Sequence, residues 1–426
     1  MSVHTIQELK QFQAMPLQVK IAMTKVRIRD WVNYYGREGV YVSFSGGKDS
    51  TVLLHLVREE YPDIPAVFVD TGLEYPEIRQ FVKTFDNVTW VKPKMTFKQV
   101  IEKYGYPFIS KEVSECVYGA RKYLTQLVAD GTILQTDRQP DRQYKYEYRY
   151  KKLCGVGEYS KFSASPITDK KQGNGGGSQS ICLNTINCTD LASTLKRRMA
   201  NREGGQNQRL LIMLGELPAK SNKTEIIPDK SLYSQEKYKF FLEAPFEISN
   251  KCCNVMKKQP AHRYCKETGR VPMIATMASE SRLRTQKWLQ NGCNGFDMKE
   301  PISTPMAFWT EQDVLRYIKE NNIPICSVYG NIVPDYNDNE LEGQIDISDL
   351  GLSDDNRKLK TTGCDRTGCM FCGFGCHMKN DTRFVRMKET HPKVYDYIMR
   401  PKEQGGLNYK EIIDWINEHG NLNIRY

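Results

Sequence analysis

Two hydrophobic patterns alternate along the first hundred residues of the chain. Short continuous apolar runs at residues 40–44, 66–69 and 88–91 are typical of buried strands, because a strand covered on both faces has no solvent-exposed side. Residues 51–60, between the first two runs, instead repeat apolar positions at helical spacing. Strands that alternate with helices form parallel sheets. We therefore predict an α/β fold whose parallel twisted sheet has helices on both faces.

Helical patterns also occur towards both ends of the chain. Residues 1–35 are predicted to form an amphipathic helix with four buried positions, Ile21, Val26, Ile28 and Trp31. Residues 310–321 (TEQDVLRYIKEN) begin with a threonine of the capping type before another amphipathic helix. Two further helical stretches are predicted at residues 381–399 and 408–419.

The middle of the chain lacks this regular alternation. We interpret residues 124–246 as an insertion that contains a glycine-rich linker at residues 170–178. Within it, a small helical unit is predicted at residues 189–201 and a strand at residues 210–214.

These patterns divide the chain into four parts. Residues 1–123 hold the N-terminal helix and the first part of the α/β domain, and residues 124–246 are the insertion. The second part of the α/β domain follows at residues 247–330, and residues 331–426 form a cysteine-rich region with helices.

Charge and hydropathy indicate which partners and which cellular compartment are expected for the protein. The chain has 61 basic and 51 acidic residues and a net charge of +10, which suits anionic partners but equally describes a solvated basic surface. The polar start MSVHTIQELKQF lacks the apolar core of a secretory signal, and no run of about 18 apolar residues occurs. We expect a cytoplasmic protein without a membrane partner.

The most specific motif is SGGKDS, which follows the first predicted strand. It does not have the spacing of a Walker loop, yet its residues suit phosphate capture. Gly46 and Gly47 allow a tight turn and close approach of an anion, and Ser45 and Ser50 offer hydroxyl groups. The helix that follows points its free amide groups at the same place, and Lys48 adds a positive charge.

The thirteen cysteines are a second source of candidate chemistry. Cytosolic thiols stay reduced, so clustered cysteines are interpreted first as metal ligands or catalytic groups. One group is the pair Cys252 and Cys253, and the other lies in TGCDRTGCMFCGFGCHM. Zinc could bind all four cysteines of that second group, which are Cys364, Cys369, Cys372 and Cys376.

Several motifs together resemble a known family. SGGKDS after a buried strand resembles the PP-loop of the N-type ATP pyrophosphatases, and VFVDTGLEYPE at residues 67–77 is similar to the phosphoadenylyl sulfate (PAPS) reductase branch. Similar segments follow in order, namely YGYPFISKE, KCCNVMKKQP, ATMASESRLR and PMAFWTEQDVLRYIKENNIP. The resemblance covers roughly residues 40–122 and 251–400 and leaves the insertion unmatched.

The resemblance implies an adenine-nucleotide site at the carboxyl ends of the parallel strands, as is general for open α/β sheets. The nucleotide would be ATP or adenylyl sulfate, and Asp49 or Asp70 would hold Mg²⁺. Lys48 and Asp49 are implied as catalytic residues, and the arginines of SESRLR would supply forked donors to an anionic group. The implied nucleotide-binding residues are Ser43, Phe44, Ser45, Gly46, Gly47, Lys48, Asp49, Ser50, Asp70, Thr71, Gly72, Arg282 and Arg284.

The resemblance also implies a metal centre. Adenylyl sulfate reductases of this family bind a [4Fe-4S] cluster through a tandem cysteine pair and a later CxxC motif. In this chain, the corresponding ligands are Cys252, Cys253, Cys369 and Cys372. Because adjacent cysteines are awkward ligands for a single structural zinc, we favour the iron-sulfur cluster and keep zinc as the alternative.

The chain departs from the reductase pattern at its end. Reductases of this family carry a nucleophilic cysteine on a C-terminal tail, whereas this chain ends GNLNIRY. The nearest substitute is Cys376, which Gly375 and His377 flank, and we expect its thiol pKa to be lowered by a cationic neighbourhood.

Three functions remain open. The first is a sulfur-transfer (thiolation) enzyme in which ATP adenylates the substrate and Cys376 or Cys116 carries a persulfide. The second is an adenylyl sulfate or PAPS reductase that produces sulfite, and the third is a nucleotide sensor without turnover. YKYEYRYKK, which interleaves aromatic and basic residues, makes nucleic acid a candidate partner, although it equally describes an edge strand. A sulfur or electron donor protein and a second copy of the chain are the other candidate partners.

Overall fold

The computed structural model describes residues 4–129, 133–135, 148–151, 159–161, 207–213, 235–335 and 357–426. The chain divides into two compact units, each made of two segments. The first unit comprises Met1–Thr96 and Val255–Met370, and the second comprises Phe97–Asn254 and Phe371–Tyr426. These boundaries differ from the four-part division of the sequence, because each unit combines parts of the chain that are far apart in sequence.

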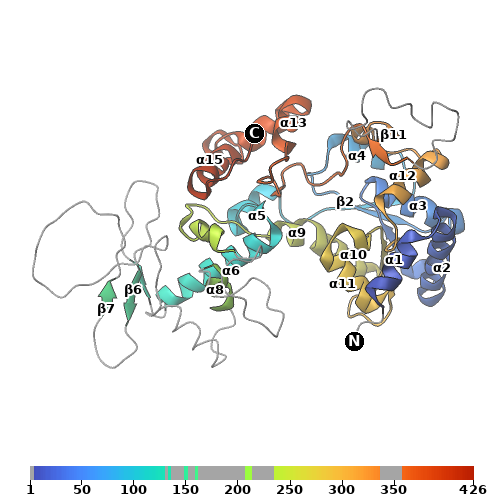
Figure 1. Cartoon of the computed structure of the whole chain (residues 1–426), viewed down its shortest axis with the longest axis horizontal. Helices are drawn as coiled ribbons and strands as arrows, with labels where there is room; N and C mark the ends of the chain where they lie inside the picture. The colour runs from blue at the N-terminus through green and yellow to red at the C-terminus, as the bar shows by residue number, and fades with distance from the viewer. Residues whose placement is uncertain are drawn as a thin grey trace, which may run out of the picture. The chain divides into compact units, whose positions relative to one another are not determined.

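The first unit is built on a six-stranded sheet (Figure 1). Its strand order is β3-β2-β1-β8-β10-β9, and every neighbouring pair is parallel except β10 with β9. The predicted α/β class with a mostly parallel sheet is therefore confirmed. The strands are β1 (Val40–Ser43), β2 (Ala66–Val69), β3 (Val88–Val91), β8 (Val271–Ile274), β9 (Asn294–Gly295) and β10 (Ile302–Ser303).

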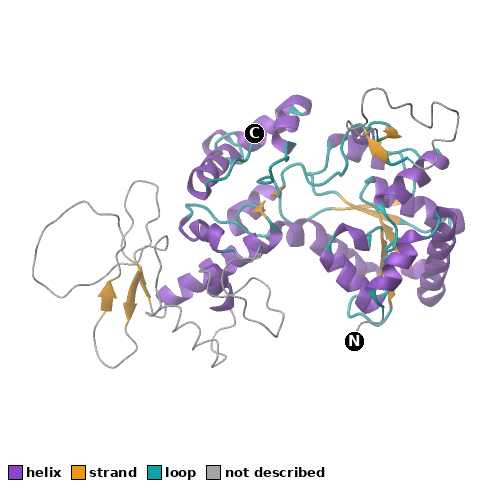
Figure 2. Cartoon of the chain, viewed as in Figure 1, coloured by secondary structure: helices purple, strands orange, loops and turns teal. Residues whose placement is uncertain are grey.

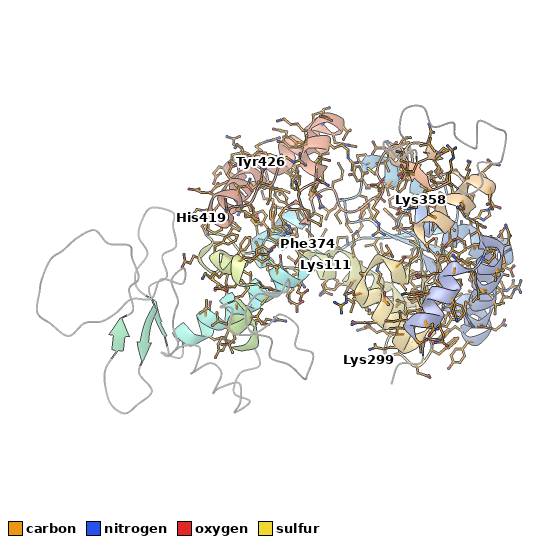
Figure 3. All side chains as sticks on the ribbon, in the orientation of Figure 1. Lys111, Lys299, Lys358, Phe374, His419 and Tyr426 are labelled. Carbon is orange, nitrogen blue, oxygen red and sulfur yellow. The ribbon has the colours of Figure 1, made fainter. Side chains whose placement is uncertain are left out.

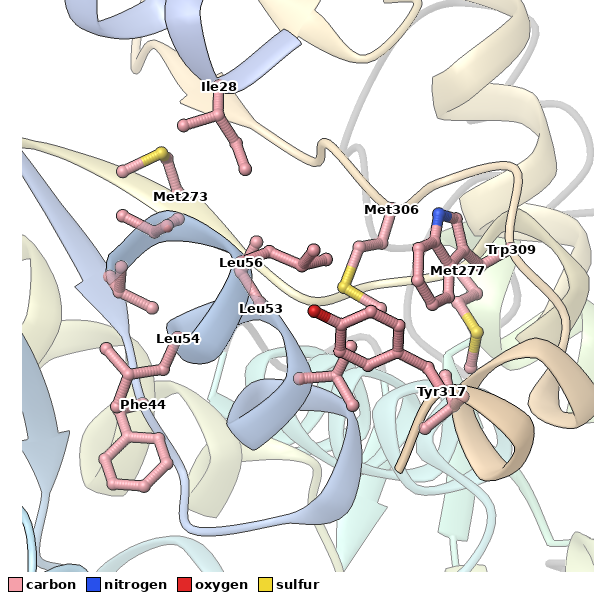
Figure 4. Close-up of a cluster of buried hydrophobic side chains, with 14 of the residues drawn as sticks. Ile28, Phe44, Leu53, Leu54, Leu56, Met273, Met277, Met306, Trp309 and Tyr317 are labelled. Atoms are coloured by element: carbon pink, nitrogen blue, oxygen red, sulfur yellow. The ribbon is translucent and has the colours of Figure 1, made fainter. Parts of the chain in front are cut away.

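Both faces of this sheet are buried, as continuous apolar strands require. Val40 and Val42 of β1 belong to the large hydrophobic core, whereas Tyr41 belongs to a smaller cluster on the opposite face with Val67 and Tyr264. Figure 4 shows part of the large core, in which Leu53 and Leu56 lie near Met306 and Tyr317. The helices of the unit are α1 (Ile6–Ala14), α2 (Leu17–Tyr35), α3 (Lys48–Glu60), α4 (Pro76–Val82), α10 (Gln259–Thr268), α11 (Arg282–Asn291) and α12 (Glu311–Glu320).

The predicted N-terminal helix is two helices, because the chain is extended at Met15 and Pro16 between α1 and α2. Ile28 and Trp31 are fully buried, as expected, and Ile21 is partly buried. The expected burial of Val26 is wrong, since this side chain is 46% exposed on the outer face of α2. The capping prediction for α12 is confirmed, since Thr310 and Asp313 bond each other's backbone amide groups.

The second unit contains helices around a small two-stranded parallel sheet. In that sheet β4 (Phe108–Ile109) pairs with β13 (Gly373–Phe374), so residues more than two hundred positions apart are neighbours. Figure 2 shows that helices dominate this unit. They are α5 (Phe97–Tyr104), α6 (Lys111–Ala129), α8 (Asn207–Met213), the short α9 (Lys251–Cys253), α13 (Arg383–Thr390), α14 (Pro392–Met399) and α15 (Tyr409–Gly420).

The insertion differs from its predicted secondary structure in one place. The strand predicted at residues 210–214 is wrong, because Asn207–Met213 is helix α8. Leu210, Leu211 and Met213 are all fully buried, and a short apolar run that is buried on every side has no periodicity by which a strand and a helix differ. The helical unit predicted at residues 189–201 and the linker at residues 170–178 lie outside the described residues.

The tyrosine-rich segment of the insertion is partly described. Tyr148–Lys151 forms strand β6, which pairs on both sides with β5 (Ile133–Gln135) and β7 (Tyr159–Lys161). It is therefore a strand, but the central one of three rather than an edge strand. Among the described helices, none is both long enough and apolar enough to span a membrane.

Candidate functional site

The loop that joins β1 to α3, residues 43–50, is called here the nucleotide loop. Gly46 adopts a positive φ of 71°, and a Cβ atom there would lie 2.7 Å from Val82 Cγ2 and 2.9 Å from Ile78 Cγ2. Both neighbours belong to α4 and are buried. Gly46 is therefore required by its backbone conformation and by the close packing of the loop on α4.

The two serines of the nucleotide loop hold its shape. The Ser50 hydroxyl lies 3.0 Å from the Ser45 hydroxyl and accepts a hydrogen bond from the Ser45 amide at 3.1 Å. The Gly47 amide donates to Ser45 Oγ at 3.3 Å. In this structure the hydroxyl groups thus bond within the loop, and Lys48 begins helix α3 directly after it.

Lys48 is almost completely buried, with its side chain 2% exposed. Its ammonium group donates to the Asp365 carbonyl oxygen at 2.7 Å and forms an ion pair with Glu311 at 3.0 Å. Its backbone amide donates to the Tyr329 hydroxyl at 3.1 Å. Lys48 therefore connects the nucleotide loop to α12 and to the segment that precedes the CxxC motif.

Asp49 is the neighbouring carboxylate. One of its oxygens, Oδ1, forms a long ion pair with Lys48 Nζ at 3.9 Å and has no hydrogen-bond partner among the described residues. This oxygen is buried, while the side chain as a whole is 25% exposed. Burial raises the pKa of Asp49, and the nearby charges of Lys48 and Arg366 oppose that shift. A buried carboxylate oxygen without a hydrogen-bond donor suits a metal cation, so Asp49 fits the predicted Mg²⁺ ligand.

Two arginines lie close to Asp49 and share one carboxylate. Glu280 forms ion pairs with Arg284 and with Arg366, the latter at 3.3 Å. Burial and the charge of Arg366 lower the pKa of Arg284, and Asp49 acts in the opposite direction. Arg282, the other predicted arginine, is exposed at the first position of α11.

The predicted residues after β2 form a separate turn. Asp70 is buried and pairs with Arg79 at 2.9 Å, and its Oδ1 atom is also without a hydrogen-bond partner among the described residues. Thr71 is fixed by two hydrogen bonds to Glu74, and Gly72 has a positive φ of 74°. This turn follows β2 at the carboxyl end of the sheet, as does the nucleotide loop after β1.

Five residues that surround the nucleotide loop were not predicted from the sequence, namely Glu280, Glu311, Tyr329, Arg366 and Thr367. Glu311 and Tyr329 contact Lys48, and Thr367 contacts Tyr329. Glu280 pairs with both Arg284 and Arg366. The nearest signal was the Asp-Arg-Thr segment directly ahead of the CxxC motif, where a basic and a hydroxyl residue adjoin the cysteines.

In the second unit, four cysteines form what is called here the cysteine group, namely Cys252, Cys253, Cys372 and Cys376. Cys253 and Cys376 each interact electrostatically with Cys372, and Cys252, Cys372 and Cys376 all act on the buried Tyr409. Burial raises the pKa of Cys372, whereas Arg383 and Lys111 lower it; Lys111 is labelled in Figure 3. The Arg383 guanidinium also donates to the Cys372 carbonyl oxygen at 2.7 Å.

Cys376 does not have the predicted low thiol pKa. Its side chain is 2% exposed, and burial raises its pKa to about 12 although Arg383 acts to lower it. Desolvation outweighs the single positive neighbour, so the expectation of an activated thiolate is wrong for this structure. The adjacent His377 also has a lowered pKa because of burial, and its Nδ1 atom is buried without a hydrogen-bond partner among the described residues. Cys116 of α6, the other predicted carrier, is buried too, and its pKa is raised to about 12.

The remaining predicted ligands belong to the first unit. Cys369 is partly buried one residue before that unit ends, and Cys364 is buried beside Cys326. In the described part of the chain, no group of three or more histidine, cysteine, aspartate or glutamate side chains is arranged to hold a metal ion. The [4Fe-4S] ligand set and the zinc alternative both remain predictions.

Comparisons of the sequence with a family model and with individual proteins find the same family. The family model of the phosphoadenosine phosphosulfate reductase domain matches residues 39–125 and 215–374. An adenosine 5′-phosphosulfate reductase of Geobacillus kaustophilus is 28% identical over 127 residues, which cover 26% of this chain and 51% of that protein. A phosphoadenosine 5′-phosphosulfate reductase of Photorhabdus laumondii is 51% identical over 41 residues, which cover 10% and 17%.

A structural comparison adds one solved protein. The phosphate complex of a phosphoadenylyl-sulfate reductase from Candida auris aligns with 77% of this chain and 92% of its own, at 11% identity and a TM-score of 0.30. The sequence matches span about half the length of the Geobacillus relative and less of the Photorhabdus relative.

Proposed function

The chain belongs to the phosphoadenosine phosphosulfate reductase domain family, and we propose that it binds ATP and adenylates a substrate that then accepts sulfur. The observation that carries the choice of ATP is the buried Asp49 oxygen that no hydrogen-bond donor satisfies, with only the Lys48 ammonium near it at 3.9 Å. A bare carboxylate beside a phosphate loop repels an anion, whereas a carboxylate that shares Mg²⁺ with the phosphates attracts one.

The positive side chains around the loop support the same nucleotide. Lys48, Arg284 and Arg366 lie around Asp49, and each now pairs with a carboxylate of Glu311 or Glu280. A triphosphate carries more charge than adenylyl sulfate and gains more from three cations and a metal ion. If phosphate oxygens replaced Glu280 and Glu311 as the partners of these basic side chains, each side chain would still be paired with a negative charge.

The proposed reaction follows from this arrangement. A carbonyl oxygen of the substrate attacks the α-phosphorus, the bond from that phosphorus to the bridging oxygen breaks, and pyrophosphate leaves with the electron pair. Lys48, Arg284 and Arg366 stabilise the negative charge that grows on pyrophosphate. Mg²⁺ held by Asp49 would screen the same charge. A sulfur nucleophile then displaces AMP from the activated carbon.

The sulfur chemistry is assigned to the cysteines. The donor set of the cysteine group is chemically suited to iron, because thiolates are the ligands of iron-sulfur clusters. We retain Cys252, Cys253, Cys369 and Cys372 as the proposed ligands of a [4Fe-4S] cluster, which would supply a site for sulfur at iron. A free Cys376 or Cys116 is a poor carrier as it stands, because both thiols are buried and protonated at neutral pH.

A reductase is the alternative, and the names of the matched relatives favour it. Reduction of adenylyl sulfate requires a thiolate that attacks the sulfate sulfur. The pKa of about 12 at Cys376 argues against this residue as that thiolate. Nucleotide binding without turnover would indicate the third possibility, a nucleotide-sensing partner protein.

The proposal is tested with anaerobically purified protein and two reactions. We expect AMP and pyrophosphate from Mg·ATP when sulfide and an acceptor are present, with transfer RNA and duplex DNA as the acceptors tried. Asp49→Asn should abolish this reaction, whereas Asp63→Asn, at an aspartate that is 56% exposed, should leave it unchanged. Sulfite release from adenylyl sulfate with a thiol donor, without AMP from ATP, would overturn the proposal in favour of the reductase.

A further inference from the structure

A pair of hydroxyl groups occupies the mouth of the nucleotide loop. The Tyr329 hydroxyl accepts a hydrogen bond from the Lys48 amide at 3.1 Å and lies 2.6 Å from the Thr367 hydroxyl. Tyr329 is 2% exposed and Thr367 is partly buried. Because burial raises the pKa of Tyr329 to about 12, its hydroxyl stays protonated and can donate to Thr367 while it accepts from Lys48.

This pair stands where an anion would approach. A Cβ atom added to Gly47 would lie 3.2 Å from the Tyr329 hydroxyl and 3.4 Å from the Thr367 hydroxyl, so both oxygens cover the open side of that glycine. The Lys48 amide is the first of helix α3, and such amides are the donors that phosphate oxygens accept from in strand-loop-helix sites. The tyrosine oxygen therefore accepts from an amide of the kind that binds phosphate oxygens in such sites.

Thr367 of this pair belongs to a segment, residues 365–367, that contacts the site in three places. Residues 365–367 bond Lys48 through the Asp365 carbonyl, Glu280 through Arg366 and Tyr329 through Thr367. Cys369 follows only two residues later, within the same unit. These three contacts give a change at the mouth of the loop a direct route to the backbone before Cys369.

We propose that the Tyr329 and Thr367 hydroxyl pair fills the phosphate position of the free chain, and that a bound phosphate group displaces it and loosens residues 365–367 ahead of Cys369. The inference rests on the proposed nucleotide site and adds to it a competitor within the chain. A charged phosphate oxygen is a stronger acceptor for the Lys48 amide than a neutral phenol oxygen. Arg366 is also drawn from Glu280 towards the phosphate, since its guanidinium is 55% exposed and close to Asp49.

The test measures the affinity of the full-length protein for inorganic pyrophosphate and for ATP by titration calorimetry. Tyr329→Phe keeps the ring beneath the Lys48 ammonium and removes only the competing oxygen. We expect it to bind pyrophosphate about 5-fold more tightly, which corresponds to one hydrogen bond that no longer has to be broken. Thr367→Val should tighten binding about 2- to 3-fold. Tyr34→Phe is the matched control, since Tyr34 is 65% exposed, and should leave affinity unchanged.

Hydrogen exchange of the same protein gives the second readout. Pyrophosphate should slow exchange in the amides of residues 46–50 and speed it in residues 365–369 of the wild-type protein. In Tyr329→Phe with Thr367→Val, exchange of residues 365–369 should already be fast before ligand is added. Thermal unfolding of each variant establishes that it is folded.

Weaker binding by Tyr329→Phe would overturn the inference, because the hydroxyl would then be a ligand of the anion. Slower or unchanged exchange at residues 365–369 on binding would also overturn it. If ATP binds without that change, the nucleotide site stands and the displacement fails. If pyrophosphate produces the change but ATP does not bind, the displacement stands and the proposed nucleotide fails. Absence of binding by either anion would refute both.

Discussion

The nucleotide loop and the cysteine group are assembled in opposite ways. The loop comes from one stretch of eight residues whose glycine conformation and serine hydrogen bonds are local. The cysteine group combines α9 with residues on either side of β13, more than a hundred positions later in the chain. The conformation of the loop is therefore largely determined by the residues of its own motif. The cysteine motifs specify only which residues are present. The reactivity of these thiols depends on how far tertiary packing buries them.

The largest expected effect contrasts two adjacent glycines. Gly46→Ala combines a positive φ with contacts below 3.0 Å to Val82 and Ile78, so we expect nucleotide affinity to fall more than about 100-fold. The free energy of unfolding should decrease by about 2–4 kcal/mol. Gly47 has a φ of −79°, and a Cβ atom added there would contact only hydroxyl groups at 3.2 Å or more, so Gly47→Ala should remain stable. Calorimetric titration and urea unfolding measure both effects, and equal behaviour of the two variants would contradict the local account.

The second prediction concerns the cysteine group. Anaerobic protein should contain about four irons per chain by the family resemblance, and Cys372→Ser should lose most of them. Cys265→Ser, outside the group on α10, is the control and should keep its iron. Cys376→Ala should also keep iron if the ligands are those proposed. Iron loss in Cys376→Ala would place this residue among the ligands, and one zinc in place of iron would establish the zinc alternative.

A smaller effect is expected for Arg366, which the motif did not indicate. Arg366→Gln removes a forked donor near Asp49, and we expect ATP affinity to fall about 5- to 10-fold. The loss is limited because the arginine must leave Glu280 to bind phosphate. Arg37→Gln, at an exposed arginine paired with Asp63, is the matched control. Affinities from titration that are unchanged in Arg366→Gln would remove this residue from the site.

The smallest expected effect is a pH dependence. Because burial raises the pKa of Asp49 in the folded chain, the folded state holds a proton more readily than the unfolded state between the two pKa values. Lowering the pH through this window should raise the contribution of Asp49 to folding stability while weakening Mg·ATP binding a few-fold. Asp49→Asn should lack the pH dependence of binding. Titrations between about pH 4 and 7 measure it, and an increase in affinity at low pH would contradict the metal role.

The sequence predicted those features that depend on local pattern. Strands β1 to β3 were found from their short continuous apolar runs, helix α3 from its helical periodicity and the cap at Thr310 from its residue type, and each of these signals lies within one segment. Helix α8 was mistaken for a strand because a fully buried run lacks periodicity. Val26 was predicted to be buried because it is hydrophobic, but the sequence does not show which face of α2 packs on the core.

The missing parts of the site share one cause. Tyr329 and Arg366 reach the nucleotide loop from segments about 280 and 320 residues later, and no spacing rule connects such positions. The pKa of Cys376 was expected to be low because a positively charged neighbour was inferred from the sequence. The burial that raises this pKa could not be inferred from it. Contacts and desolvation between distant segments therefore account for what the sequence did not predict.

The central claim is that the nucleotide loop of the first unit binds ATP through its phosphates with the help of a metal ion. Its most direct test is calorimetric titration of the anaerobically purified protein with ATP, adenylyl sulfate and the 3′-phosphorylated form of adenylyl sulfate, each with and without Mg²⁺. We predict saturable binding of one ATP per chain that requires Mg²⁺ and disappears in Gly46→Ala. Tighter binding of either sulfate nucleotide without Mg²⁺, or ATP binding unchanged in a folded Gly46→Ala variant, would contradict it.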